Sequence, residues 1–452
     1  MGKVLCFIGA EKSLSNILKY NFFEKLFNNQ IKIITTSTIA KGYESKIELT
    51  NYTSNWTPSD IDTFHLHLLF RNFLTRNNKA LNYELRNRIF GPYKIRRIQD
   101  ILLASKYFWN SITKIKWLLL FRNLFKSCHQ MLFDLRKSRA ISEGDYSSLI
   151  KILEENKITA AISITPFRDP KIYDLAEACH ALNIPLHIFT ECWDNVSSGY
   201  GIPSYISGLH LWSAQQLQEI SKFYPQYALK SEIIGSYRRS YALDFQQEVR
   251  LNDGEFNILY LEGYFYENLN YTINTIQEAL VKSNLILTKN KINLIVRRYP
   301  LKRQSIDVIE EENWIRTINI NQCTISVSTS KLIDLNDEFF NTNLVISELT
   351  TAGLEAQFRN IPTFFIGSHS SPRFLDSAAG YNFPFAHLIK ESDFFFNLSV
   401  EKDINRLING LHNLSDNHLR NDKALELSEK INFYAEPFNL TKWNILINKL
   451  SK

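Results

Sequence analysis

The chain has 452 residues, which is too long for one ordinary hydrophobic core, and a prior of roughly 150 residues per domain predicts two or three domains. Hydrophobic residues make up 44% of the sequence and charged residues 22%, a composition that excludes intrinsic disorder, collagen and long coiled coil. The cysteines form no Cys-x-x-Cys pair or Cys/His cluster, so a disulfide framework and a zinc site are not supported and a reducing cytoplasm is expected. They are Cys6, Cys128, Cys179, Cys192 and Cys323.

Targeting and membrane signals are not evident in the sequence. The amino-terminal MGKVLCFIGA carries one lysine and a short β-type run, whereas a secretory signal peptide needs a longer apolar region and a cleavage site with small residues. No window holds 18 uninterrupted apolar residues, so no membrane-spanning helix is predicted.

Residues 1–245 are predicted to form a first α/β domain. KVLCFIGA, a following amphipathic stretch and QIKIITTS make a strand, a helix and a strand, which is the βαβ unit of a parallel sheet. No Gly-x-Gly-x-x-Gly joins the first strand to its helix, which argues against NAD. The alternation of helices and strands then continues. Helices are predicted at 146–158, 170–184 and 215–225, and strands at 159–165, 185–191, 208–214 and 231–236.

Residues 60–145 interrupt this domain with long stretches of helical pattern, rich in Trp, Phe, Leu, Lys and Arg. Within them, residues 64–139 hold 16 lysines and arginines against three acids, a net charge of +13, so the remainder of the chain carries −7. The sequence therefore predicts a basic, aromatic helical insertion.

Three interpretations of this insertion remain open. It can be a solvated helical subdomain whose aromatic side chains form its core. Basic side chains flanking Trp109, Trp117, Phe121 and Phe125 also suit docking on an anionic membrane surface. Nucleic acid is the third partner that such charge could attract. Because no nucleic-acid-binding motif is present and the remainder is acidic, we rank a membrane or an anionic glycan above nucleic acid.

Residues 246–420 are predicted to form a second α/β domain, and residues 421–452 a carboxyl-terminal helix that returns to the first domain. The expected strands are FNILYLEG, INLIVRRYP, TISVSTS, NLVISE and IPTFFIG. Expected helices are NLNYTINTIQEALVKSN, AGLEAQFRN, INRLINGLHNL and FNLTKWNILINKL. The boundary between the two domains is placed near residues 243–254.

The segment 346–367, ISELTTAGLEAQFRNIPTFFIG, combines a strand end, a polar turn, a helix, a proline break and another strand. The first strand would deliver Ser347, Glu348, Thr350 and Thr351 to the carboxyl edge of a sheet. Open parallel sheets bind their ligands at that edge.

Two explanations of the helix after this turn fit equally well. A glycine at Gly353 lets the backbone approach a phosphate, which the free N–H groups and the dipole of a helix start attract. Glu355 would then accept hydrogen bonds from the ribose of a nucleotide. Alternatively, Thr350 or Thr351 is an ordinary N-cap and Glu355 lies on a solvated face.

The pattern S-E-x-T-T-x-G-x-E-A followed by N-I-P resembles the donor-nucleotide signature of GT-B glycosyltransferases. In that superfamily, a Ser/Thr-rich turn and "EA" precede a Gly-Lys-Pro turn, whose place Asn360-Ile361-Pro362 takes here. The resemblance implies two Rossmann-like domains that face each other across a cleft, with the nucleotide-sugar bound by the second.

A second resemblance lies at residues 191–238, which contain ECWDNVSSGYG, a later tryptophan and GSYR. The segment is similar to the WDN-x-S-S/T-G … W … G-S-x-R block of bacterial surface- and capsular-polysaccharide transferases. The positions that match are Trp193, Asp194, Asn195, Ser197, Ser198, Gly199, Trp212, Gly235, Ser236 and Arg238. In the transferase hypothesis, Trp193, Asn195, Ser197, Ser198 and Arg238 belong to the acceptor side or the cleft.

Asp194 follows a predicted strand and would project into the cleft. There it could take the proton of an acceptor hydroxyl, as the general base of an inverting transferase. An Asx-turn, in which Asp194 or Asn195 bonds its own backbone, explains the same residues without chemistry. Glu191 and Asp169 are reserve bases.

Arg297 and Arg298 end another predicted strand of the second domain. The similar transferases often have R-x-H-P here, so Tyr299 replaces a phosphate-binding histidine and leaves one of the two arginines as the expected clamp. A pair of surface arginines is the other interpretation. Gly263, which ends the first strand of that domain, is expected against the pyrophosphate.

The hypothesis that these patterns and resemblances favour is a metal-independent, inverting glycosyltransferase with no cofactor, which moves a sugar from a nucleotide-sugar to a surface or capsular polysaccharide. Glu348 and Glu355 lie one residue short of the E-x7-E spacing of many retaining enzymes, which favours inversion. The basic residues 64–139 would bring this cytoplasmic enzyme to the inner face of a membrane and a lipid-linked glycan acceptor. Alternatives are a non-hydrolysing sugar-nucleotide epimerase, a polyol-phosphate transferase and a non-catalytic binding protein with the same frame.

Overall fold

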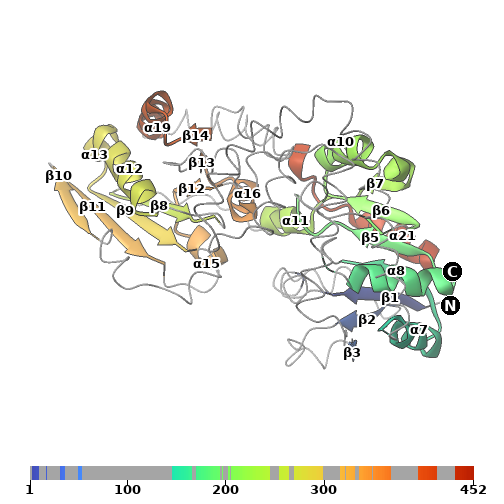
Figure 1. Ribbon diagram of the computed structural model, residues 1–452. Helices are drawn as coiled ribbons and strands as arrows, with labels where there is room; N and C mark the ends of the chain where they lie inside the picture. Colours follow the sequence, from blue (N-terminus) through green and yellow to red (C-terminus); the bar gives the residue numbers. More distant parts are fainter. Residues whose placement is uncertain are drawn as a thin grey trace, which may run out of the picture. The chain divides into compact units, whose positions relative to one another are not determined.

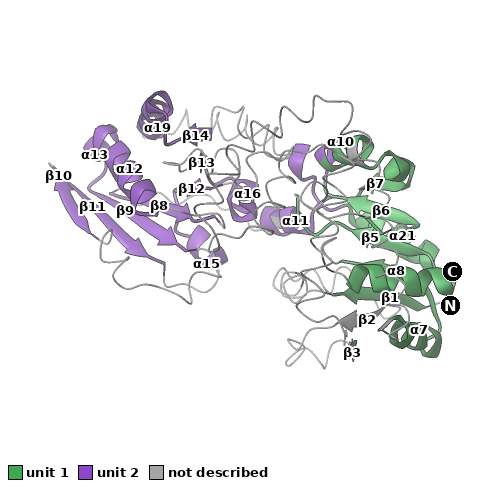
Figure 2. Cartoon of the chain, in the orientation of Figure 1, with its two compact units in different colours: residues 1–212, 216–234, 439–452 green, residues 213–215, 235–438 purple. Residues whose placement is uncertain are grey.

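The computed structural model describes the chain in two compact units, shown in different colours in Figure 2. Residues 1–212, 216–234 and 439–452 make up the first unit, and residues 213–215 and 235–438 the second. The predicted helical insertion lies outside the described residues apart from residue 145. The described residues are 3–9, 17, 31–35, 49–52, 145–164, 169, 171–193, 196, 202–203, 205–244, 254–263, 269–298, 316–320, 322–330, 335–348, 350–367, 395–414 and 433–451.

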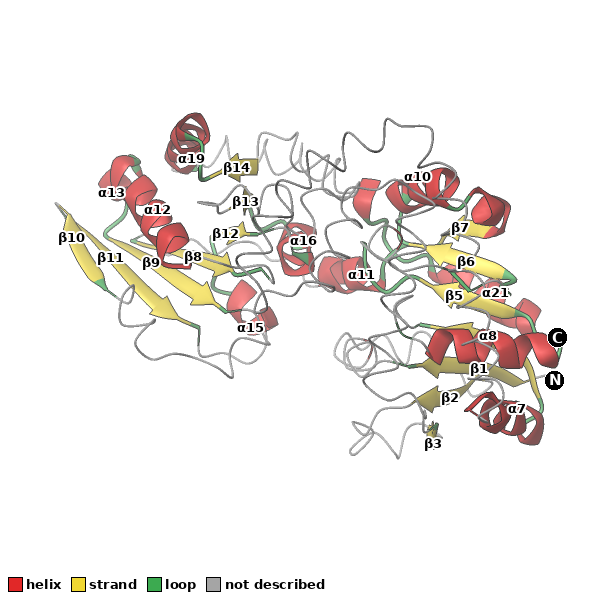
Figure 3. Ribbon diagram, in the orientation of Figure 1, coloured by secondary structure: helices red, strands yellow, loops and turns green. Residues whose placement is uncertain are grey.

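The first unit holds a sheet of seven strands, all paired in parallel (Figures 1 and 3). The first three strands follow one another from the middle of the sheet to one edge. The fourth strand lies on the other side of the first, and the remaining strands follow it to the opposite edge. This is a doubly wound, Rossmann-like sheet, as predicted. In spatial order its strands are β3 (Leu49–Asn51), β2 (Ile31–Thr35), β1 (Lys3–Ile8), β4 (Ile158–Ser163), β5 (Leu186–Phe189), β6 (Gly208–Leu211) and β7 (Ser231–Ile233).

Helices of the first unit pack on a buried apolar core, where Ile172 and Leu175 meet Leu5 and Phe7 of the sheet. The last helix of the chain also belongs to this unit, because Trp443 packs edge-on against Phe189 with ring centroids 4.8 Å apart. The helical elements are α7 (Asp145–Glu155), α8 (Lys171–Ala181), α10 (Ala214–Phe223), the 3-10 helix η2 (Pro225–Lys230) and α21 (Leu440–Leu450).

The second unit holds another sheet of seven strands, in which all pairs are parallel except the antiparallel edge pair β10–β11. Its order repeats the doubly wound pattern of the first, with the reversal between β8 and β12. The spatial order is β10 (Thr317–Ile320), β11 (Cys323–Thr329), β9 (Lys291–Arg297), β8 (Glu255–Leu261), β12 (Leu344–Ser347), β13 (Thr363–Gly367) and β14 (Phe395–Asn397).

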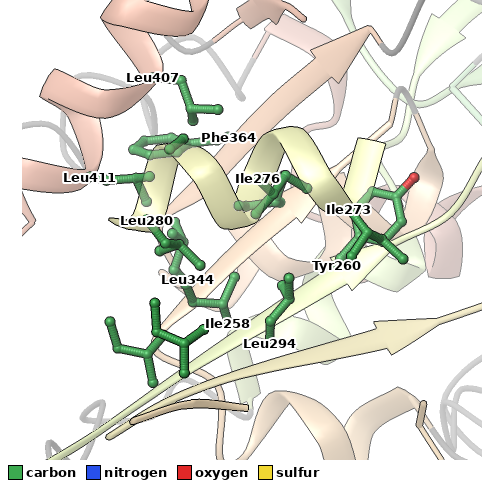
Figure 4. Close-up of a cluster of buried hydrophobic side chains, with 14 of the residues drawn as sticks. Ile258, Tyr260, Ile273, Ile276, Leu280, Leu294, Leu344, Phe364, Leu407 and Leu411 are labelled. Atoms are coloured by element: carbon green, nitrogen blue, oxygen red, sulfur yellow. The ribbon is translucent and has the colours of Figure 1, made fainter. Parts of the chain in front are cut away.

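Helices cover both faces of the second sheet, so β12 and β13 are buried along their whole length, whereas β9 and β11 alternate between buried and less buried residues. On one face, a single buried cluster joins the sheet to α12 (Leu269–Lys282) and α19 (Glu401–Asn413); Figure 4 shows Ile273 of α12 beside Tyr260, and Leu407 of α19 beside Phe364. On the other face, Leu259 joins a smaller cluster with residues of α15 (Leu335–Phe339) and α16 (Thr351–Phe358). Two further helices are α11 (Tyr237–Asp244) and α13 (Leu285–Thr288).

No helix in the described part of the chain is both long enough and apolar enough to cross a bilayer.

A pair of histidines, half-buried His187 and buried His210, joins two neighbouring strands of the first sheet. His187 Nδ1 and His210 Nε2 lie 3.0 Å apart, and the ring of His210 stacks on Phe189. A side chain at Gly208 would place its Cβ 2.5 Å from His187 Nδ1, so glycine makes room for the pair. Burial, helped by repulsion from Lys449, lowers the pKa of His187 to about 4, and burial with repulsion from His187 lowers the pKa of His210 to about 3.

This pair predicts that the first unit loses stability in mild acid. Both pKa values lie below the ordinary 6.5, so the unfolded chain takes up these protons first as the pH falls. Unfolding free energy should be highest above pH 6.5 and lower at pH 5, by about 2 kcal/mol from His210 and a similar amount from His187. Urea unfolding at pH 7.5 and pH 5 measures the loss, which His210→Gln should reduce by about half. An equal loss in the variant and the parent protein would contradict this account.

Candidate functional site

Three strands of the second sheet end level with one another at its carboxyl edge. Leu261 of β8 pairs with Arg297 of β9 on one side and with Ser347 of β12 on the other. The order of the strands reverses between β8 and β12, and open α/β sheets bind ligands outside such a switch point. The structure therefore brings the ends of three strands together at one edge. Each of these ends carries residues that the sequence predicted to bind the donor.

The polar turn between β12 and α16, residues 347–353, is called the corner below. Ser347 Oγ donates to the carbonyl oxygen of Glu348 at 2.6 Å and lies 3.0 Å from Thr350 Oγ1. Thr350 is in an extended conformation and its Oγ1 accepts from the N–H of Gly353 at 3.1 Å, so it is the N-cap of α16. A Cβ at Gly353 would lie 2.7 Å from Ser347 Oγ and 2.8 Å from Phe365, so the corner requires glycine there.

Capping and ligand binding are compatible at this corner, because the Thr350 side chain accepts a hydrogen bond only from the N–H of Gly353, the third residue of the helix. Thr351, the first residue of α16, is half-buried. The start of the helix keeps its dipole toward the carboxyl edge, which suits an anion.

Glu355 does not lie on a solvated face. Its carboxylate is buried and forms an ion pair with Arg238 of α11, with 2.8 Å between Oε1 and Nη1 and side-chain exposures of 5% and 8%. Arg238, which the sequence grouped with the acceptor residues, belongs to the second unit together with Glu355. The structure thus joins a donor candidate to an acceptor candidate inside one unit.

Further arginine contacts fix α11 on α16. Arg359 donates to the carbonyl oxygen of Glu355 at 3.1 Å, and its guanidinium lies over the ring of Tyr241. Arg239 lies over the ring of Phe358 and donates to the carbonyl oxygen of Ala435. Burial lowers the pKa of Arg239, an effect that attraction to Glu436 partly opposes. These contacts explain why α11 belongs to the second unit, whereas the sequence placed it before the boundary.

Arg297 and Arg298 are each held by a carboxylate. Neighbouring residues of a strand point to opposite faces, so Arg297 reaches Glu338 of α15 at 2.7 Å and Arg298 reaches Glu262, beyond β8, at 2.9 Å. Both ion pairs are almost buried. A phosphate could use either arginine only by sharing it with its carboxylate.

Glu348 is held on the opposite face of the sheet from α16. Tyr260 donates its hydroxyl hydrogen to Glu348 Oε1 at 2.9 Å, and both side chains are buried. A Cβ at Gly263 would lie 2.2 Å from Glu348 Oε2, so the glycine makes room for this carboxylate. Tyr260 could not be recognised from the sequence, because a tyrosine inside an apolar strand gives no signal beyond core packing.

Residues 191–238, which resemble the polysaccharide transferases, are described only in part. Asp194, Asn195, Ser197 and Ser198 lie outside the described residues, whereas Glu191 and Trp193 are buried just after β5. The proposed base and its neighbours therefore stay predictions.

Gln216 of α10 holds this segment in place, although no sequence pattern marks this residue. Its Oε1 accepts from Thr190 Oγ1 at 2.9 Å and from the N–H of Trp212 at 2.7 Å. Its Nε2 donates to the carbonyl oxygens of Cys192 at 2.8 Å and Trp193 at 3.2 Å. A fully buried glutamine thus ties the end of β5 to the end of β6.

Asp169 has a clear structural role before α8. Its Oδ1 accepts from the N–H of Lys171 at 3.0 Å, and Lys171 Nζ donates to the carbonyl oxygen of Gly9 at the end of β1. The carboxylate is therefore part of the capping of α8, beside the switch point of the first sheet.

The second unit thus offers hydroxyl groups, a helix start and balanced ion pairs at its switch point. Among the described residues, no group of His, Cys, Asp and Glu side chains has the arrangement of a metal site. This arrangement can bind a phosphate through dipoles and hydroxyls and can bind polyol groups through carboxylates.

Comparison with known proteins gives no family. No family model matches the chain, and no curated protein matches it in sequence. Solved structures similar to it include MurG of Acinetobacter baumannii (11% identity, TM-score 0.49) and UDP-GlcNAc 2-epimerase of Methanocaldococcus jannaschii (10%, 0.49). A third is the glycosyltransferase VinC in complex with dTDP (8%, 0.43). Each alignment covers 99% of both chains. Identities and TM-scores this low carry no information about the reaction, so we take function from the chain's own residues.

The buried pair between Arg238 and Glu355 predicts a large stability effect. Glu355→Ala leaves a buried guanidinium without its carboxylate and should lower the unfolding free energy of the second unit by about 3 kcal/mol. Glu255→Ala in the same unit is the matched control, because Glu255 and Lys291 form a half-exposed pair that should contribute less than about 1 kcal/mol. Chemical unfolding of both variants makes the comparison, and equal losses would show that burial of the first pair has no energetic consequence.

Proposed function

We propose that the protein is a glycosyltransferase that moves a sugar from a nucleotide-sugar to a surface or capsular polysaccharide. The observation that carries this proposal is the corner at the switch point of the second sheet, where a capped helix start, two hydroxyl groups and Gly353 lie together. A nucleoside diphosphate is the anion for which such a site in a doubly wound sheet is suited.

In the proposed donor site, the diphosphate lies at the start of α16, near Ser347, Thr350 and Thr351. The helix dipole stabilises the negative charge that grows on the leaving phosphate, so no metal is needed. Arg297 or Arg298 assists only while shared with its carboxylate partner. Glu355 remains the candidate that accepts hydrogen bonds from the ribose, and its carboxylate also holds α11 through Arg238.

In the proposed acceptor site, Asp194 is the general base. It takes the proton of an acceptor hydroxyl while the oxygen attacks the anomeric carbon, the bond from that carbon to the phosphate oxygen breaks, and the nucleoside diphosphate leaves. This displacement inverts the anomeric configuration. Glu191 and Asp169 rank lower as bases, since Glu191 is buried and Asp169 caps a helix.

The acceptor in this proposal is a glycan, carried on lipid where the basic residues 64–139 dock on an anionic membrane surface. The net charge of +13 over these residues supports that partner. Trp193, Asn195, Ser197 and Ser198 remain candidates for the acceptor side.

Incubation with a panel of nucleotide-sugars, with and without cell-surface glycan, tests the function. We expect release of a nucleoside diphosphate only when both donor and glycan are present. Formation of an isomeric sugar-nucleotide without glycan would indicate an epimerase, and binding without turnover would indicate a binding protein.

The same assay with Asp194→Asn separates the base from the donor site. The variant should bind the nucleotide with unchanged affinity and lose at least about 100-fold in transfer rate, the usual contribution of general-base catalysis. Unchanged turnover would remove Asp194 from the mechanism, and loss of nucleotide binding would show that it acts elsewhere.

A further inference from the structure

The carboxylate of Glu348 needs an explanation in any site that binds phosphate at the corner. It stands two residues before the capping Thr350 and carries the charge that opposes an anion there. The interaction between like charges grows as they approach and is strongest away from solvent. The effect on a bound diphosphate therefore depends on where the carboxylate is held.

Tyr260 of β8 and Gly263, just beyond the end of β8, both bear on the position of this carboxylate. The strand register pairs Tyr260 with Ile346, so the tyrosine and Glu348 lie on the same face of the sheet, the face that α12 covers. Tyr260 is fully buried in the apolar cluster drawn in Figure 4, and its hydroxyl reaches Glu348 Oε1 at 2.9 Å. A hydrogen bond donated to a carboxylate favours its charged form and fixes its orientation.

Gly263 leaves the space that this carboxylate occupies. Glu348 Oε2 occupies the space that a side chain at position 263 would take, at 2.2 Å from the ideal Cβ. Helix α16 packs against the other face of the sheet, where Ala356 meets Leu259 and Val345. The charge of Glu348 is thus turned away from the face on which α16 lies.

We propose that Tyr260 is a positioning residue of the nucleotide site, whose hydroxyl holds the Glu348 carboxylate over Gly263 and so keeps its negative charge away from a diphosphate at the corner. This inference rests on the proposed function. In this inference Gly263 makes room for the Glu348 side chain, whereas the sequence predicted that this glycine lies against the pyrophosphate.

Tyr260→Phe removes one hydroxyl and keeps the packing of the ring. Calorimetric titration with UDP, GDP, CDP, ADP and dTDP identifies the nucleoside diphosphate that binds the parent protein most tightly. The variant should bind that diphosphate about tenfold more weakly, bind the corresponding uncharged nucleoside normally, and show a larger deficit at low salt than at high salt.

Tyr271→Phe is the matched control. Its hydroxyl donates to the carbonyl oxygen of Leu398 at 2.8 Å, and its ring packs against the same cluster. This variant loses a comparable tyrosine hydrogen bond without touching Glu348, and it should bind the diphosphate as the parent does.

A second substitution distinguishes positioning from a general structural role. If Tyr260 acts by holding a charge, then Glu348→Gln in the Tyr260→Phe background should recover most of the lost affinity, because the neutral amide cannot repel phosphate. No recovery, or equal affinities of the Tyr260→Phe and Tyr271→Phe variants for the diphosphate, would overturn the inference. Failure of the parent protein to bind any of the five diphosphates would instead overturn the proposed function, and this inference with it.

Discussion

The parallel pairing of β8 with both β9 and β12 is the constraint on which the candidate site depends. Because Leu261 pairs with Arg297 and with Ser347, three chain segments leave the sheet at the same level and in the same direction. The reversal of strand order between β8 and β12 then leaves an edge where connecting segments diverge. Side chains that are far apart in sequence meet there for reasons of topology alone.

Charge at that edge is balanced locally, and the balance restricts the chemistry. Arg297, Arg298 and Arg238 each meet a glutamate at 2.9 Å or less. Removing one member of such a buried pair is costly, since it leaves a charge without compensation. Since these three arginines of the described residues are already paired, a phosphate in the proposed site would be bound mainly by the helix start and the hydroxyl groups.

Much of the fold follows from the sequence, because buried parallel strands are continuous apolar runs that end at polar or glycine residues. FNILYLEG, INLIVRRYP and NLVISE were correctly predicted as strands, and their order in the chain gave the α/β class. The edge strand Thr317–Ile320 was missed, since four residues of alternating pattern give a weak signal.

The contacts within the site could not be predicted in the same way. Arg238 and Glu355 are 117 positions apart, and nothing in either neighbourhood pairs them. Likewise, the Tyr260 hydroxyl and the space above Gly263 reach Glu348 only because β8 and β12 are paired side by side in the sheet. Sequence patterns identified which residues carry chemistry, whereas the register of the sheet decides which of them touch.

The central claim is that a nucleotide binds at the corner between β12 and α16. Hydrogen–deuterium exchange with and without a nucleoside diphosphate tests it directly, since a bound phosphate protects the backbone amides that it contacts. The account predicts slower exchange in peptides covering residues 344–358, with little change in peptides from the carboxyl edge of the first sheet, such as residues 158–164. Protection confined to the first sheet, with residues 344–358 unchanged, would contradict it.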